Sequence, residues 1–298
     1  MHAPRMKDVL AAFRVHIVAI AVAATVTFGY LFRGVYPIGL ALLCGFDWCI
    51  VNLLNRATDV EEDRLNAIAA TEFVARHARA IVVGCLVALG GSLAIGAVTA
   101  PWSLTVDRAV FHALGLGYSF RLVPVRSGLR RFKDLYVFKN SMSAVMFLLS
   151  VAGYPLLGRS EPLRMHATSI AAVIFFFFLF EHSFEIIYDL RDLEGDRRVG
   201  VPTYPVVHGH QTAARIVHGL CASSAAVLLG ARALDLLGTR EVLMVAAPLA
   251  QSVFLARRGP ERVSRADCIG ITYAGALALL LYLAGTAAWA RAGLPMDL

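Results

Sequence analysis

The sequence predicts an all-α integral membrane protein, a bundle of about nine transmembrane helices around a central cavity. Of the 298 residues, 58% are apolar and only 16% are charged, and the mean hydropathy is +0.66. Soluble domains usually carry about 25% charged residues, so this much apolar chain would leave large sticky surfaces in water. The apolar residues also gather in long runs without the alternation typical of a β-barrel, and helices therefore fit them best.

Nine apolar runs approach the length of about 20 residues that a helix needs to cross a bilayer. They are expected at 15–32, 35–54, 80–100, 104–118, 140–158, 166–188, 213–237, 239–256 and 267–290. The first is too long for the core of a signal peptide and is taken as retained. The fourth is the weakest, because it is short and carries Asp107, Arg108 and His112, so eight spans is the alternative count. No repeat or low-complexity linker divides the chain, and residues 1–298 are expected to form one domain.

The basic residues predict the orientation of the bundle. Most of the 28 Lys and Arg residues lie in the N-terminal arm and in the loops at 55–79, 119–139, 189–215 and 257–265. Positive charge collects on the cytoplasmic side of membrane proteins. We therefore expect the N-terminus in the cytoplasm and, with nine spans, the C-terminus outside, in a bacterial inner membrane. The chain has no free basic domain that would favour nucleic-acid binding.

Acidic and amide side chains gather at two points, each at the end of an apolar run. They are Asn55, Asp59 and Asp63 after the second run, and Asp189, Asp192 and Asp196 after the sixth. Because successive helix residues turn by about 100°, spacings of three and four place each set within an arc of about 80°. Each set therefore forms one acidic stripe, provided that the helix continues through Gly195 in the second. The predicted topology puts both stripes on the cytoplasmic side.

Two facing acidic stripes indicate a divalent cation, since unpaired carboxylates would repel each other. Mg²⁺ prefers oxygen ligands and keeps positions open for water and phosphate oxygens. Two acidic stripes with Mg²⁺ are suited to holding a diphosphate. The alternative is that these are solvated loop charges that pair with nearby arginines, as is common on helix surfaces. Two stripes on one side of the membrane favour the cation site.

A basic segment lies between the two stripes and ends at Lys139. The positive-inside rule accounts for several of its charges. The more specific interpretation is that Arg130 and Lys133, with Lys139 as a third, bind the diphosphate and stabilise it as it leaves.

Acids within the apolar runs are a further indication of a polar interior. Asp47 lies in the second run, and Glu181 and Glu185 continue the second acidic stripe into the sixth. Such residues normally face a polar cavity, or they bond neighbouring helices in a structural role. The phenylalanines at 175–178, with Phe180 and Phe184, face lipid, pack between helices or line a prenyl chain.

At these motifs the chain resembles the UbiA superfamily of intramembrane prenyltransferases. The first motif of that family is commonly written NDxxDxxxD and the second DxxxD; here they read Asn55-Arg56-xx-Asp59-xxx-Asp63 and Asp192-xxx-Asp196, with Asp189 upstream. The resemblance extends to the segments at 130–134 and 194–207 and covers nearly the whole chain. Arg56 is a departure, because many members have aspartate there, and so a carboxylate is lost.

The resemblance implies that Mg²⁺ is held by Asp59, Asp63, Asp192 and Asp196, with help from Asn55 and Asp189. The metal would bind an isoprenyl diphosphate, with Asn55 and the basic residues also contacting the diphosphate. Ionisation would give an allylic cation that a small, aromatic, quinone-precursor-like acceptor attacks, with release of pyrophosphate.

Two alternatives stay open at this point. A membrane terpene cyclase of the same family would ionise the diphosphate without an acceptor. A cation transporter, the less favoured alternative, would use the intramembrane acids as a path. Transporters tend to show paired inverted halves, and the sequence shows none.

Overall fold

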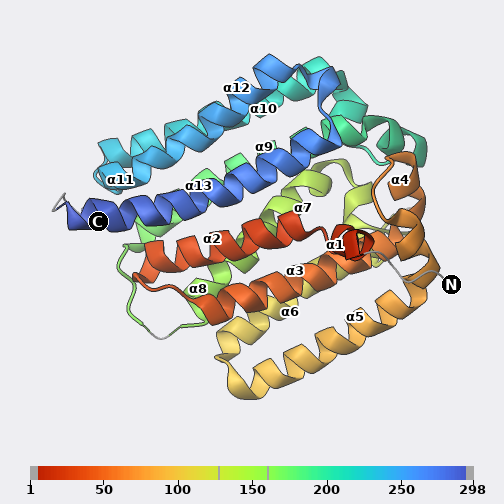
Figure 1. The fold of residues 1–298 in the computed structure, drawn as a ribbon, viewed down its shortest axis with the longest axis horizontal. Coiled ribbons are helices and arrows are strands. Elements are labelled where there is room, and N and C mark those ends of the chain that lie inside the picture. The colour runs from red at the N-terminus through yellow and green to blue at the C-terminus, as the bar shows by residue number, and fades with distance from the viewer. Residues whose placement is uncertain (1–5, 127, 160, 293–298) are drawn as a thin grey trace.

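The computed structural model describes residues 6–126, 128–159 and 161–292, so both ends of the predicted 1–298 domain lie outside the described residues. The described chain is a bundle of long helices (Figure 1). The helices before the basic segment are α1 (Met6–Ala12), α2 (Val15–Arg33), α3 (Ile38–Thr58), α4 (Val60–Leu65), α5 (Thr71–Thr99) and α6 (Trp102–Ser119). A hairpin of β1 (Val123–Val125) and β2 (Gly128–Arg130) and a 3₁₀ turn, η1 (Phe132–Asp134), follow. The remaining elements are α7 (Tyr136–Leu148), η2 (Leu149–Gly153), α8 (Tyr154–Leu157), α9 (Ala167–Val199), α10 (Tyr204–Ala233), α11 (Thr239–Val242), η3 (Leu243–Val245), α12 (Ala246–Arg258), η4 (Pro260–Arg262) and α13 (Arg265–Arg291).

The predicted all-α membrane fold is confirmed, whereas the count of nine spans is not. Within the described residues, seven helical segments are long and apolar enough to cross a membrane. The predicted fourth span is helical as α6 but is not among the seven. The predicted eighth span is divided into α11, η3 and α12, each shorter than a bilayer-spanning helix. Several helices also extend past their apolar runs: α9 continues to Val199, because charged residues can prolong a helix beyond the hydrocarbon.

A buried polar network explains how α6 lies inside the bundle despite its charges. Arg108 donates two hydrogen bonds of 2.8 Å to the carboxylate of Asp47 on α3. The Tyr154 hydroxyl donates to the same carboxylate at 2.6 Å, and His112 Nε2 lies 3.1 Å from it. The Asp47 and Arg108 side chains are 0% and 2% exposed. Asp47 therefore has the structural role of joining α3, α6 and α8, since buried charges persist where they are paired.

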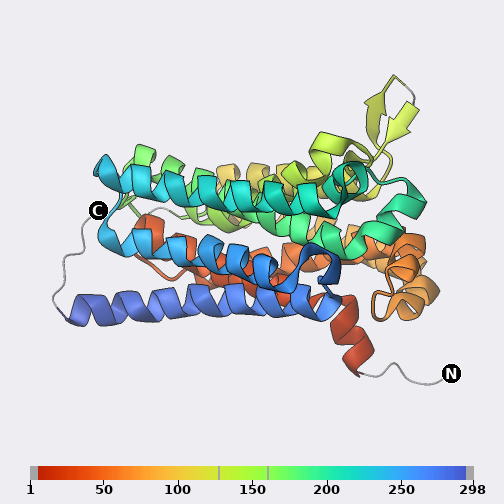
Figure 2. The ribbon, with the colours of Figure 1, turned by 90° about the horizontal axis from the view of Figure 1, so that it is seen from above.

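The helix directions bring the two acidic stretches to one end of the bundle. α2 packs between α3 and α13, and α9 packs along α10 and against α7. Helices α3 and α9 both run toward the end of the bundle where α1, α4 and the β1–β2 hairpin lie, as two perpendicular views show (Figures 1 and 2). We call this the acidic end. The last described turn of α13 lies at the opposite end (Figure 2).

Candidate functional site

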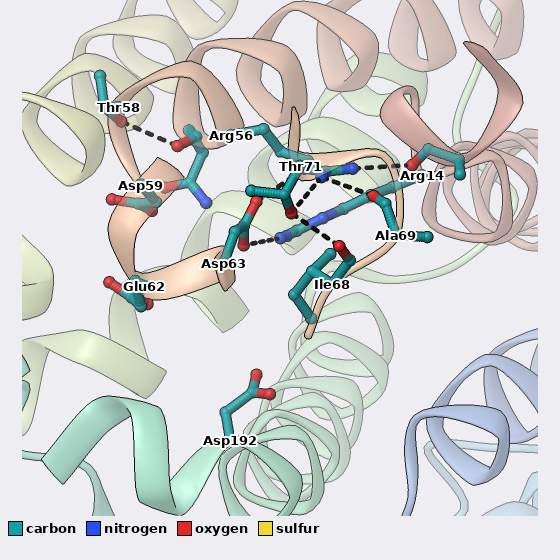
Figure 3. A network of polar contacts seen from close by, with 12 residues as sticks. Arg14, Arg56, Thr58, Asp59, Glu62, Asp63, Ile68, Ala69, Thr71 and Asp192 are labelled. Atoms are coloured by element: carbon teal, nitrogen blue, oxygen red, sulfur yellow. Dashed lines mark hydrogen bonds and ion pairs between the residues drawn. The ribbon is translucent and has the colours of Figure 1, made fainter. Parts of the chain in front are cut away.

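The first acidic stretch is broken at Asp59, so the prediction of one continuous helical stripe from Asn55 to Asp63 is wrong. Helix α3 ends at Thr58, Asp59 has φ −106° and ψ 24°, and α4 starts at Val60. The Thr58 hydroxyl donates to the backbone oxygens of Leu54 and Asn55 and closes the last turn of α3 (Figure 3). The change of direction separates Asp63 on α4 from Asn55 on α3.

Asp59 lies between two cations that η1 and its flanking residue supply. Lys133 Nζ lies 2.7 Å from Asp59 Oδ2, and Arg131 Nη1 lies 2.9 Å from Asp59 Oδ1. Lys133 also donates to Glu62 at 2.6 Å. Burial raises the pKa of Asp59 to about 6, despite the opposing effect of the Lys133 and Arg131 charges. The sequence indicated Lys133, but it did not single out Arg131 or Glu62.

Asp63 is held by arginines. Arg56 Nε lies 2.9 Å from Asp63 Oδ2, and Arg14 Nη2 lies 3.5 Å from Asp63 Oδ1 (Figure 3). The Arg56 side chain is 0% exposed and also donates to the backbone oxygens of Ala11 and Ala69. Arg56, which stands where the family motif commonly has aspartate, thus neutralises Asp63, the last aspartate of that motif.

The second acidic stretch is a stripe along α9, as predicted. The helix continues through Gly195. Asp189 is buried, ion-paired with Lys139, and accepts a 2.8 Å hydrogen bond from Asn140. Asp192 pairs with its neighbour Arg191. Asp196 is buried, and its Oδ2 has no hydrogen-bond partner among the described residues.

The two stretches approach each other at the acidic end. Gly195 allows this approach, because a Cβ there would lie 1.9 Å from Oδ1 of Asn66, which follows α4. Asp192 points from α9 toward the segment that carries Asp59, Glu62 and Asp63 (Figure 3).

The predicted basic residues divide into two groups. Lys133 and Lys139 both contact acids of the site, one from each stretch. Arg130 is exposed on β2 and makes no such contact within the described part of the chain. The neighbouring Arg131 takes the position beside Asp59 instead, and it is fixed there by two hydrogen bonds of its guanidinium to Asp134.

The oxygen atoms of the site suit Mg²⁺, although most of the carboxylates are ion-paired with basic side chains. In residues 6–126, 128–159 and 161–292, no three His, Cys, Asp or Glu side chains are grouped as a ready metal site. Two buried oxygens, Asn55 Oδ1 and Asp196 Oδ2, nevertheless lack any partner there. Buried polar atoms are normally satisfied, and amide and carboxylate oxygens are ligands that Mg²⁺ prefers. These two oxygen atoms are therefore the donors best placed to hold a metal, and Asp59 and Asp192 would join them once their basic partners move away.

A small cavity with a mixed lining of apolar and polar side chains adjoins Asn55. This central cavity has a volume of about 130 Å³, and Asn55, Tyr118, Glu181 and Glu185 contribute to its walls. The intramembrane glutamates therefore face a cavity, as such residues normally do.

A larger apolar cavity continues from the central one. Its volume is about 560 Å³, and Phe176, Phe177 and Phe180 line it. Phe175 instead points outward and is 52% exposed. Ile20, Phe147 and Glu181 line both cavities, so the two adjoin.

Comparison with solved structures shows that this fold is shared. A UbiA homolog from Archaeoglobus fulgidus bound to DMAPP and Mg²⁺ is similar with a TM-score of 0.71 and 18% identity, over 92% of this chain and 96% of that one. A UbiA homolog from Aeropyrum pernix K1 has a TM-score of 0.60 and 14% identity, over 92% and 98%. Digeranylgeranylglyceryl phosphate synthase has a TM-score of 0.57 and 16% identity, over 94% and 99%.

The sequence itself establishes the family. No curated protein matches the chain. The UbiA prenyltransferase family matches residues 15–269, which include both acidic stretches, the basic segment and most of the helical bundle. The chain therefore belongs to the UbiA prenyltransferase family.

Proposed function

We propose that the protein transfers an isoprenyl group from an isoprenyl diphosphate to a small aromatic acceptor, with Mg²⁺ as cofactor and release of pyrophosphate. The observation that carries the proposal is the meeting of two acidic stretches at one end of the bundle, beside a central cavity that holds two glutamates and adjoins an apolar cavity. The family match and the similar fold of a homolog bound to DMAPP and Mg²⁺ support it.

Asn55, Asp59, Asp192 and Asp196 are the metal ligands in this proposal. Magnesium, when bound, would neutralise the diphosphate and stabilise pyrophosphate as the allylic C–O bond breaks. Asp63 and Asp189 complete the predicted ligand set. Like Asp59 and Asp192, each accepts hydrogen bonds or ion pairs at both carboxylate oxygens. All four aspartates act as ligands only if their basic partners move away.

The basic residues bind the diphosphate in this proposal. Three basic residues are ion-paired with site aspartates: Arg131 and Lys133 with Asp59, and Lys139 with Asp189. Once a metal binds these aspartates, the basic side chains would turn toward the phosphate oxygens. Charge-assisted hydrogen bonds from these groups would stabilise the charge that develops on pyrophosphate. Arg130 on the exposed hairpin remains a candidate for the outer rim of the site.

The cavities separate the two organic parts of the reaction. The apolar cavity would hold the prenyl chain, with Phe176, Phe177 and Phe180 keeping water from the allylic cation. The acceptor carbon would attack in the central cavity. Glu181 and Glu185 line this cavity and would take the proton that the acceptor loses.

The acidic end faces the cytoplasm in this proposal, in a bacterial inner membrane. The asymmetry of Lys and Arg supports that orientation. Cysteine labelling in intact cells tests it. A cysteine at Arg130, on the exposed hairpin, should react with a membrane-impermeant maleimide only after the membrane is opened, and a reaction in intact cells would reverse the orientation.

The activity is tested with purified protein in proteoliposomes, supplied with Mg²⁺, allylic diphosphates and aromatic acceptors. Pyrophosphate release and product mass are measured together. Asp59→Asn and Asp196→Asn should lose turnover by 100-fold or more, on the order of one important transition-state contact, whereas Glu72→Gln, in an exposed ion pair with Arg64, should not. Full turnover in both aspartate variants would refute the proposal. A cyclic hydrocarbon formed from the diphosphate alone would assign a terpene cyclase instead.

A further inference from the structure

Asn52 is a polar side chain of the central cavity to which the proposed reaction assigns no role. It lies on α3 and lines the cavity together with Trp48 and Asn55. It is 5% exposed, and its Nδ2 atom has no hydrogen-bond partner in the part of the chain that the structure describes. Within residues 6–126, 128–159 and 161–292, its side chain takes part in no hydrogen bond at all.

An amide without partners is costly at this position. Asn52 lies within α3, which is long and apolar enough to cross the membrane, and the surrounding hydrocarbon offers no hydrogen bonds. Buried polar atoms normally have partners. An unpaired buried amide costs free energy that a leucine of similar size would not. A molecule that enters the cavity can supply the missing partner.

Several polar groups that line the same cavity already have partners within the protein. The Trp48 ring donates from Nε1 to the Ser150 hydroxyl at 2.8 Å. The hydroxyls of Tyr188 and Thr272 bond each other at 2.6 Å. These groups therefore do not need a ligand to be satisfied, whereas the Asn52 amide does.

Asn52 lies about one helical turn deeper in the bundle than Asn55. Helix α3 runs toward the acidic end (Figures 1 and 2), and a rise of about 1.5 Å per residue places Asn52 about 4.5 Å further from that end along the helix axis. Asn55 is a proposed metal ligand, and Glu181 and Glu185, the proposed proton acceptors, line the same cavity. A molecule bonded to Asn52 would therefore lie beside the groups that carry out the transfer.

The other walls of the central cavity suit a flat ring. Trp48, Tyr118 and Phe147 line it, and the centroids of the Trp48 and Phe147 rings lie 6.1 Å apart. Aromatic side chains bind other aromatic rings through offset or edge-to-face contacts. The cavity volume is about 130 Å³, and an apolar cavity of roughly 150 Å³ in another protein binds benzene. The central cavity is thus of a size for one aromatic ring.

We propose that Asn52 binds a hydroxyl group on the aromatic ring of the acceptor and selects acceptors that carry one. This inference rests on the proposed function and deepens it, because it names a residue that determines acceptor specificity. The amide oxygen accepts a hydrogen bond from the ring O–H, or the amide nitrogen donates one to the ring oxygen. A site that bonds a substrate hydroxyl discriminates against an analogue without it, because the polar group of the site is then left unpaired.

The test compares two neutral probes that differ only in this hydroxyl, 4-hydroxybenzamide and 4-methylbenzamide. Their binding to the full-length protein in neutral-lipid nanodiscs is measured by calorimetry, without metal or diphosphate, and empty nanodiscs correct for partition into lipid. The wild type should bind the hydroxyl probe about 10-fold more tightly than the methyl probe, in line with one hydrogen bond to an otherwise unpaired amide. In Asn52→Leu the two probes should bind about equally, because leucine forms no hydrogen bond.

Gln251→Leu is the matched control for the loss of a buried amide. Gln251 lies outside the central cavity and donates hydrogen bonds to Ser183 and Cys221. Gln251→Leu should therefore unfold at a lower SDS fraction in mixed micelles and keep the wild-type preference for the hydroxyl probe. Asn52→Leu should lose that preference and unfold at an SDS fraction no lower than the wild type, because its amide has no partner in the protein to lose. A purely structural role of Asn52 would not give this combination.

Several results would overturn the inference. Equal binding of the two probes by the wild type, or an unchanged preference in Asn52→Leu, would show that the amide does not select the hydroxyl. Unfolding of Asn52→Leu at a lower SDS fraction would show that the amide is satisfied within the protein. In turnover assays, a higher KM of Asn52→Leu for the diphosphate, with an unchanged KM for the acceptor, would assign Asn52 to the diphosphate site. A hydroxyl preference that depends on Asn52, in a protein that forms no prenylated product, would sustain this site while the proposed transferase activity fails.

Discussion

Replacing Arg56 with leucine should destabilise the protein far more than any loss of an exposed ion pair. The Arg56 side chain is fully buried and connects Asp63 to the backbone oxygens of Ala11 and Ala69. In Arg56→Leu, Asp63 would keep only the 3.5 Å contact with Arg14. The Ala69 carbonyl oxygen would lose its donor as well, and that of Ala11 would keep only the backbone N–H of Arg14.

The size of the effect follows from burial. Removing one partner of a buried ion pair costs about 3–5 kcal/mol, because the other charge is left without compensation. The exposed pair between Arg64 and Glu72 is a matched control from the adjacent helix, and solvent screening leaves such pairs with little net effect on stability. We therefore expect the free energy of unfolding to fall about 3 kcal/mol further in Arg56→Leu than in Arg64→Leu.

Unfolding in mixed micelles with increasing SDS, followed by tryptophan fluorescence and circular dichroism, measures this difference. Arg56→Leu combined with Asp63→Leu should recover much of the loss, since the double variant removes the unpaired carboxylate. If Arg56→Leu unfolds at the same SDS fraction as Arg64→Leu, the buried pair does not stabilise this end of the bundle, and the reasoning fails.

Three other predictions follow from the structure. Asp47→Asn leaves Arg108 without its buried carboxylate, so the free energy of unfolding should fall by about 3–5 kcal/mol in the same micelle assay; an unchanged value would contradict the network. Ala247→Phe narrows the apolar cavity, so turnover should persist with a five-carbon diphosphate and fall at least 10-fold with a twenty-carbon one, as product mass would report. The pKa of Asp59 is raised to about 6, and its carboxylate is protonated below that value. Mn²⁺ affinity, measured by electron paramagnetic resonance, should therefore fall as the pH drops through about 6, and this dependence should become weaker in Asp59→Asn, where the other carboxylate ligands remain.

The placement of the two acidic stretches at one end of the bundle was predictable from the sequence. Each stretch follows an apolar run, and the distribution of basic residues predicts that both of these runs end on the same side of the membrane. The continuity of α9 through Gly195 was also predictable, because its aspartates keep helical spacing on both sides of the glycine.

The partners of the acids were not predictable in the same way. A break of a single residue at Asp59 moves Asp63 to another helix, and spacing alone does not reveal such a break. The sequence predicted Arg130 at the site, but the structure places Arg131 there. The hairpin and the 3₁₀ turn decide which of these two neighbours points inward, and spacing alone does not reveal this. The spacing from Arg131 to Asp134, whose carboxylate accepts hydrogen bonds from the backbone and the guanidinium of Arg131 in the structure, was the one local pattern that could have indicated Arg131.

Arg56 also changes the net charge of the site. In the first motif of the family a carboxylate is common there, whereas in this chain a buried guanidinium occupies one oxygen of Asp63. A metal that used Asp63 fully would have to displace a group with three further hydrogen bonds. Asp59 is less constrained, because its partners Lys133 and Arg131 also have other acids to bind, Glu62 and Asp134. The first acidic stretch therefore offers a metal mainly Asn55 and Asp59, and Arg56 supplies internally a positive charge that a second cation would otherwise bring.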